Sequence, residues 1–205
     1  MDRKMIKRLV ASFAAVGVAA AVAGLGSFAT FTSSTSASHT VSSGTVAINL
    51  AAPGTANRLT IGAANVVPGD TIQRVADLTN SSGGGGDTLS AIVLSTGASP
   101  SSLLDTETAG GLQMTIEKCS NAWTEAGTSP AYTYTCSGTT STVLASRPVI
   151  GSNLALAGLA SLTPGSTDHL RVTLTLPAAA PNALQNQTST ISYNFVGTQR
   201  VAGNK

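Results

Sequence analysis

Side chains able to do chemistry are scarce in this 205-residue chain, and their spacing matches no common catalytic pattern. The two histidines, His39 and His169, belong to no His-Glu-x-x-His motif, and the chain has no Gly-x-Ser-x-Gly motif. A zinc site needs three or four ligands, and no such set is recognisable in the sequence. The one pair of neighbouring acids, Asp105 and Glu107, stands in a predicted loop. We therefore predict a protein that is not an enzyme, with no catalytic, metal or cofactor site. Both histidines are interpreted as solvated side chains.

The two cysteines, Cys119 and Cys136, are separated by sixteen residues. In an exported chain such a pair favours a disulfide, with a metal site as the alternative. Closing a loop of this size stabilises a fold by about 3 kcal/mol in the chain-entropy model. The bridge would join residues 112–118 to the segment around Tyr132 and Tyr134.

A secretory leader accounts for the start of the chain. Four basic residues precede seventeen apolar or small residues at positions 9–25, as in a signal-peptide helix. We predict a signal peptide over residues 1–29, cut between Ala29 and Thr30, with Ala37 as a competing site. A retained membrane anchor is the alternative, although alanine and glycine make the segment weakly hydrophobic. The predicted location is outside the cell, in the extracellular matrix or on the cell surface.

Removing this leader changes the charge of the chain. From Thr30 onward there are seven lysines and arginines and eight acids, so the net charge falls to about −1. Without a basic stripe, nucleic acid is excluded as a partner. The remaining length suits one domain with a complete core. We place that domain at residues 44–200, with a tail at 201–205.

Alternating apolar residues predict the secondary structure. A period of two is typical of half-buried antiparallel strands, and Pro-Gly or glycine-rich breakers separate the runs. The runs are Val46, Ile48, Leu50; Leu112, Met114, Ile116; Leu170, Val172, Leu174, Leu176; and Ile191, Tyr193, Phe195. The predicted fold class is therefore all-β, a single antiparallel β-sandwich.

Three connecting segments gave further expectations. The sequences at 67–71 and 162–167 each predict a tight turn that leads into a strand, because proline presets φ and glycine accepts a positive φ. The glycine run at 82–87 lacks the lysine of a phosphate-binding loop and is interpreted as a hairpin loop. Residues 152–160 are compatible with a short strand or with one helical turn.

Several of these features together resemble the TasA/camelysin family of biofilm matrix proteins. The resemblance rests on the leader ending Gly-Ser-Phe-Ala, the following Thr-Phe-Thr-Ser, the Ser43-Gly44-Thr45-Val46 segment, and Asn65 to Asp70 before a strand ending Thr79-Asn80-Ser81. It implies a jelly-roll or Ig-like sandwich, removal of the leader by a dedicated signal peptidase, and polymerisation into extracellular fibres. The acidic residues common in the family after the start are replaced here by serine-rich residues 33–38.

The resemblance predicts a structural protein whose main partner is itself. Residues 30–43 would form an assembly arm, with Thr30 at its start and Phe31 and Val41 as anchors, pairing with an open sheet edge of the next copy. Accessory matrix proteins are possible partners, and membrane contact is expected only through the uncleaved leader. A disordered spacer at residues 30–43 is the alternative for this segment.

Two other function classes compete with fibre formation. A monomeric adhesion or glycan-binding module would use Trp123, Tyr132 and Tyr134 as its binding patch, unless these rings pack on the sheet. The camelysin branch also carries a metallo-endopeptidase label, which the scarcity of ligands does not favour.

Overall fold

The computed structural model describes residues 47–81 and 88–200, which all belong to one compact unit, Ser43–Lys205. Within these residues the protein is all-β with antiparallel sheets, so the predicted fold class is confirmed. The leader, the cleavage residues Ala29 and Thr30, the arm anchors Phe31 and Val41, and His39 lie outside the described residues. So do the glycine run at 82–87 and the tail.

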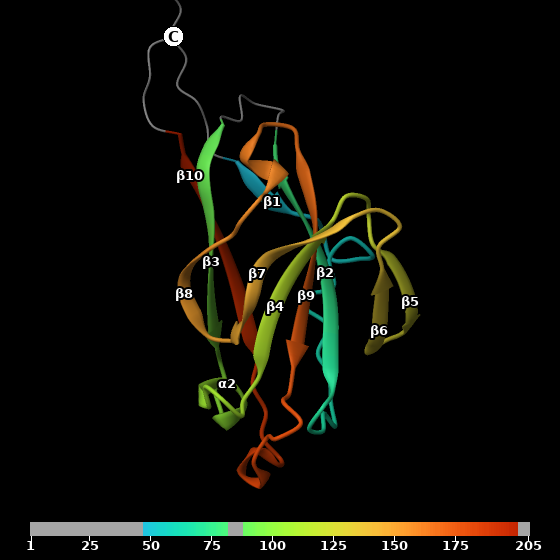
Figure 1. Cartoon of the computed structure of the whole chain (residues 1–205), viewed down its shortest axis with the longest axis vertical. Helices are drawn as coiled ribbons and strands as arrows, with labels where there is room; N and C mark the ends of the chain where they lie inside the picture. Colours follow the sequence, from blue (N-terminus) through green and yellow to red (C-terminus); the bar gives the residue numbers. More distant parts are fainter. Residues whose placement is uncertain (1–46, 82–87, 201–205) are drawn as a thin grey trace, which may run out of the picture. The chain divides into compact units, whose positions relative to one another are not determined.

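Two main sheets and a hairpin make up the fold (Figure 1). The five-stranded sheet has the order β1 (Ile48–Leu50), β2 (Thr71–Asn80), β9 (Thr167–Thr175), β4 (Gln113–Cys119), β7 (Thr140–Pro148). The three-stranded sheet has the order β10 (Ile191–Gln199), β3 (Leu89–Ala98), β8 (Gly151–Ala155). The hairpin consists of β5 (Thr124–Thr128) and β6 (Ala131–Thr135).

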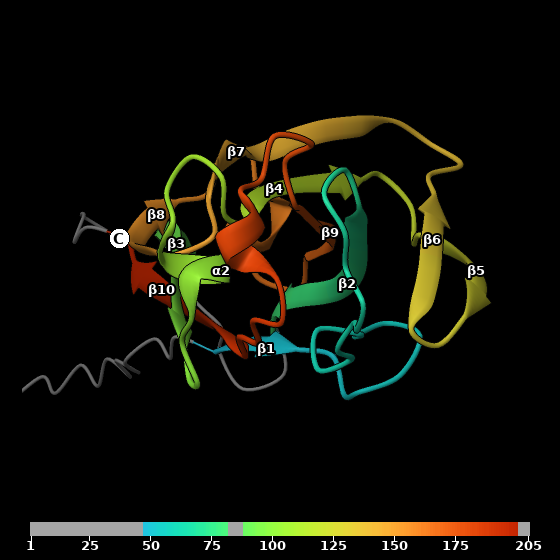
Figure 2. The same cartoon turned by 90° about the horizontal axis from the view of Figure 1, so that it is seen from below.

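The hydrophobic core lies between the two main sheets, which face each other in Figure 2. Alternate residues of each strand point inward, so that Leu94 of β3, Ile116 of β4 and Leu170 of β9 are completely buried. Burying a side chain of this size contributes about 1.5–3 kcal/mol. The predicted alternation therefore identified the inward faces of β4, β9 and β10.

The two predicted Pro-Gly turns are present and close opposite ends of the β2–β9 pair. Gly69 and Gly165 have φ angles of 99° and 76°, which a side-chain-bearing residue rarely adopts. The Gly69 amide donates to the Leu176 carbonyl at 2.8 Å, and the Gly165 amide donates to the Asn80 carbonyl at 2.8 Å. Each turn therefore also satisfies backbone groups at the end of the neighbouring strand.

Two local expectations are settled or corrected by the structure. The segment 152–160 is a strand in its first part, as β8, and a 3-10 helix, η1 (Ala160–Leu162), begins at its end. The predicted loop around Asp105 is wrong, because a one-turn helix, α2 (Leu103–Thr106), occupies it. Ser102 and Asp105 form a reciprocal capping box at its start. A second 3-10 helix, η2 (Asn182–Leu184), precedes β10.

None of the helices in the described part of the chain has the length and hydrophobicity needed to cross a membrane.

Candidate functional site

The outer face of the five-stranded sheet brings several charged and reactive side chains together. Strand register places Glu117 of β4 opposite Arg171 of β9, and it aligns Cys119, His169 and Asp77 in a row across β4, β9 and β2. The β5–β6 hairpin connects to this face through several bonds, one of which runs from the Tyr134 amide to Gln73 Oε1 at 3.2 Å. This row is therefore the candidate functional site.

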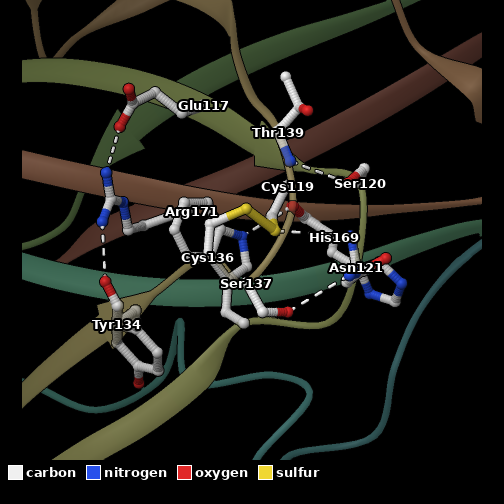
Figure 3. The surroundings of a disulfide bond; sticks show 11 residues. Glu117, Cys119, Ser120, Asn121, Tyr134, Cys136, Ser137, Thr139, His169 and Arg171 are labelled. Atoms are coloured by element: carbon white, nitrogen blue, oxygen red, sulfur yellow. Dashed lines mark hydrogen bonds and ion pairs between the residues drawn. A yellow bond between two sulfur atoms is a disulfide. The ribbon is translucent and has the colours of Figure 1, made fainter.

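The disulfide between Cys119 and Cys136 fixes the hairpin to this sheet (Figure 3). Its two Cα atoms are 5.7 Å apart, within the usual range. The bond joins the last residue of β4 to the residue that follows β6, which confirms the predicted bridge. Because it spans 17 positions of sequence, it restricts the unfolded chain and holds the hairpin base in place.

Arg171 links the hairpin to the sheet in three directions. Its guanidinium forms an ion pair with Glu117 and donates from Nη1 to the Tyr134 carbonyl at 3.0 Å. The same group lies over the indole of Trp123, with Cζ 4.2 Å from the ring centroid. Figure 3 shows Arg171 between Glu117 and Tyr134 beside the disulfide. The arginine therefore acts as a structural connector.

His169 is not the solvated histidine that the sequence suggested. Its Nδ1 lies 2.7 Å from Asp77 Oδ1, and its side chain is 24% exposed. The His169 carbonyl accepts a bond of 2.8 Å from Trp123 Nε1. The prediction failed because Asp77 belongs to a strand far away in sequence, which only the sheet register brings alongside.

A second connector, on the β2 side of the hairpin, was not predicted. Arg58 makes a two-pronged contact with Glu125, from Nε at 2.9 Å and from Nη2 at 2.8 Å, and the Tyr134 hydroxyl donates to the same carboxylate at 3.0 Å. The bond from Arg58 holds the pKa of Glu125 below its usual range. The pKa of Tyr134 is raised, mainly by burial and secondly by the bond to Glu125. No sequence signal pairs Arg58 with Glu125 across 67 positions.

The aromatic residues proposed for adhesion pack within this assembly. Tyr134 is 5% exposed, and the ring of Tyr132 lies under Arg58, with Cζ 4.9 Å from the centroid. Trp123 borders a hollow of about 110 Å³ shared with Asp77 and Thr55. The alternative that these rings pack on the sheet is the one the structure supports.

Asp168 on the inward face of β9 is a buried carboxylate with a clear structural role. It is 2% exposed and accepts bonds from the backbone amides of Ser161 at 2.7 Å and Ala160 at 3.0 Å. The amine of Lys118 lies 3.2 Å away. Burial by itself would raise the pKa of Asp168, but these bonds lower it below the ordinary value. The carboxylate therefore anchors the start of η1 to the sheet.

The described residues do not fit a catalytic metal centre. In positions 47–81 and 88–200 no three His, Cys, Asp or Glu side chains gather as metal ligands. His169 and Asp77 are hydrogen-bonded to each other, and both cysteines are oxidised to a disulfide. Zinc requires at least three protein ligands, so this donor set is insufficient.

The three-stranded sheet differs from this assembly in having no charged side chain in any strand. The sequences of β10, β3 and β8 contain no Asp, Glu, Lys, Arg or His. Among the described strands, β10 pairs with β3 alone and is an edge of the sheet. Natural edge strands of this length are usually protected by lysine or proline, and β10 contains neither.

The comparisons with known proteins locate this fold within a family. A family model described as camelysin metallo-endopeptidase matches residues 4–117, more than half of the chain. The chain belongs to the camelysin family. No curated protein matches it.

The camelysin match ends within β4, so the disulfide, the hairpin and β10 lie beyond it. The features that distinguish the two sheets therefore come mostly from the part of the chain outside the matched region. The capping box in α2 was missed although its Ser-x-x-Asp spacing was readable in the sequence.

Proposed function

We propose that this camelysin-family protein is a secreted, non-enzymatic structural protein that assembles with copies of itself into extracellular fibres. The observation that supports this most strongly is the edge strand β10. It is nine residues long, and it lacks both charge and proline. Exposed edges of this kind pair readily with another strand.

The local geometry of β10 explains how an added strand would fit. Thr190 exchanges backbone hydrogen bonds with Ser99 and Pro100, at 2.9 and 3.1 Å, so alternate residues direct their backbone groups toward β3. The intervening residues, which include Tyr193 and Phe195, direct theirs to the opposite side. The side chains of Tyr193 and Phe195 pack against the core. A strand added at this edge would therefore lie beside the core, and it would extend the sheet and place its own inward side chains next to these rings.

The donor strand in this proposal is the N-terminal arm of the next copy. Cleavage between Ala29 and Thr30 by a dedicated signal peptidase would free the arm, and Phe31 and Val41 would supply its apolar anchors. A contact between an arm and an edge joins two different surfaces, so it repeats without closing and produces a filament. The disulfide is consistent with the proposed secretion, because such bonds persist in oxidising compartments.

Electron microscopy of three purified chains at increasing concentration tests the arm. The chain Thr30–Lys205 should form filaments, whereas a deletion of residues 30–37 should stay monomeric with an unchanged circular dichroism spectrum. Deletion of residues 201–205 is the control and should leave filaments intact. Filaments from the folded arm deletion would refute strand donation.

The non-enzymatic part of the proposal has a separate test. Zinc content and hydrolysis of unstructured peptides should both be at background for Thr30–Lys205 purified without chelators. Stoichiometric zinc together with hydrolysis that a chelator abolishes would reassign the protein to the peptidase activity in the family's description.

A further inference from the structure

The outer face of the three-stranded sheet carries no charge and is partly exposed in the described part of the chain. Strand register aligns three rows of uncharged residues across it. The rows are Val196, Val93 and Ala155; Asn194 and Ser95; and Ser192 and Gly97. Val196 is 45% exposed, one of three large apolar side chains exposed to this degree in the described residues and the one that lies on a strand.

Among residues 47–81 and 88–200, no element covers this face. Ala155, Asn194 and Ser192 are also exposed, in contrast to the opposite sheet, where Val75 on the outer face is only 3% exposed. In Figure 2 the hairpin of β5 and β6 lies beside β2, at the far side of the molecule from β3 and β8. An uncovered apolar row on a sheet is typical of an interaction surface.

We propose that this face is a lateral contact surface that packs against the same face of a second copy in a neighbouring filament. The inference rests on the proposed filament but concerns a different surface, because strand donation uses the edge of β10 and this contact uses its outer side chains. Filaments would associate side by side through stacked sheets, which pack about 10 Å apart.

The lack of charge favours a second copy as the occupant. A charged partner would lose hydration against this face and gain no ion pair, because β10, β3 and β8 contain no charged residue. An identical uncharged face imposes no such cost and no like-charge repulsion. Residues as small as Gly97 and Ala155 also allow two sheets to approach closely.

The size of the face determines how strongly two copies can associate. Nine residues at about 3.3 Å and three strands at about 4.8 Å give about 30 by 14 Å, and because β8 has only five residues, about 400 Å² is the upper limit for each copy. A stable protein pair buries about 800 Å² on each side. A single contact is therefore weak, and lateral association should appear only when a filament repeats it many times.

The test introduces charge at the centre of the face and at a matched position elsewhere. Val196→Lys places like charges opposite one another across the contact. Val67→Lys, at a valine that is 57% exposed in the turn before β2, is the control. Filaments of each variant and of the unmodified chain are imaged at about 10 mM salt, where the screening length is about 30 Å.

The expected result is bundles of parallel filaments for the unmodified chain and for Val67→Lys, and separate filaments for Val196→Lys. At about 1 M salt, where the screening length falls to about 3 Å, bundles of Val196→Lys should return, which shows that the variant is folded. Equal bundling of all three chains at low salt would overturn the lateral contact and leave the filament proposal intact.

Other outcomes also decide the matter. Absence of filaments from the unmodified chain overturns the filament proposal and this inference together. If Val196→Lys keeps its bundles but loses binding to an insoluble polysaccharide such as cellulose, the face is a glycan-binding surface and the lateral contact is wrong.

Discussion

The outer faces of the two sheets differ in how far the rest of the described chain covers them. On the five-stranded sheet, a disulfide, two arginine connectors and a hairpin occupy the outer side, and Val75 there is 3% exposed. On the three-stranded sheet no described element covers the outer side, and Val196 is 45% exposed. The comparison shows that the described chain covers one outer face itself, whereas the other face and its edge are the surfaces that we propose contact further copies.

The largest effect is expected at the disulfide. Replacing both cysteines, Cys119→Ser with Cys136→Ser, should lower the free energy of unfolding by about 3 kcal/mol, because the unfolded chain regains the freedom of a closed loop. Urea unfolding measures the change. Filament formation should persist, since β10 lies in the other sheet. Unchanged stability would mean that Arg171 and Arg58 hold the hairpin without the bridge.

The next effect concerns the buried carboxylate. Asp168→Asn should lower the free energy of unfolding by about 2 kcal/mol. The amides of Ala160 and Ser161 each bond to a different carboxylate oxygen of Asp168, and an asparagine side chain has only one acceptor oxygen. Asp70→Asn is the control, since Asp70 is exposed and asparagine can keep its bond to the Val67 amide. Thermal unfolding of both variants checks the difference, and equal melting temperatures would contradict the role of Asp168.

Acid should weaken the fold by protonating three carboxylates whose pKa is lowered. The pKa values of Asp168 and Glu125 are lowered in the folded protein, and so is that of Asp105, where burial opposes bonds from Ser189 and Ser101. A lowered folded pKa stabilises the protein above the unfolded value, about 4, and this stability is lost as pH falls through the folded value. Stability should therefore be level above about pH 5 and decline below about pH 4. A decline that begins near pH 6 would contradict this assignment.

The smallest effect should separate the two outer faces directly. Val75→Thr buries a hydroxyl group and should cost about 1–2 kcal/mol. Val196→Thr exposes the hydroxyl to water and should change stability by less than about 0.5 kcal/mol. Denaturant unfolding of the two variants gives the comparison, and equal losses would mean that the outer side of β10 is covered as well.

Local patterns allowed part of this structure to be predicted. Alternation located Met114 and Ile116 on the core face, and the Pro-Gly pairs located the turns at Gly69 and Gly165, because both signals depend on neighbouring residues. The hairpin was missed because its two strands, at 124–128 and 131–135, are largely exposed and show little apolar alternation. The predicted loop at Asp105 failed where a capping box could have been read.

The candidate site was predicted only as far as its covalent bond. A lone pair of cysteines, in a chain predicted to be exported, sufficed to predict the bridge, whatever the fold. The side-chain partners Asp77 of His169, Glu117 of Arg171 and Lys118 of Asp168 could not be read, because each is at least 50 positions away in sequence.

The sequence by itself determined the strands with clear apolar alternation (β4, β9 and β10), the two Pro-Gly turns, the disulfide and the scarcity of charge, because these depend on local alternation, backbone preference and composition. The tertiary structure alone decided which strands share a sheet. That choice placed every charged strand residue outside β10, β3 and β8, and it left one sheet without charge. Strand pairing depends on contacts between residues far apart in the chain, and no local pattern records it.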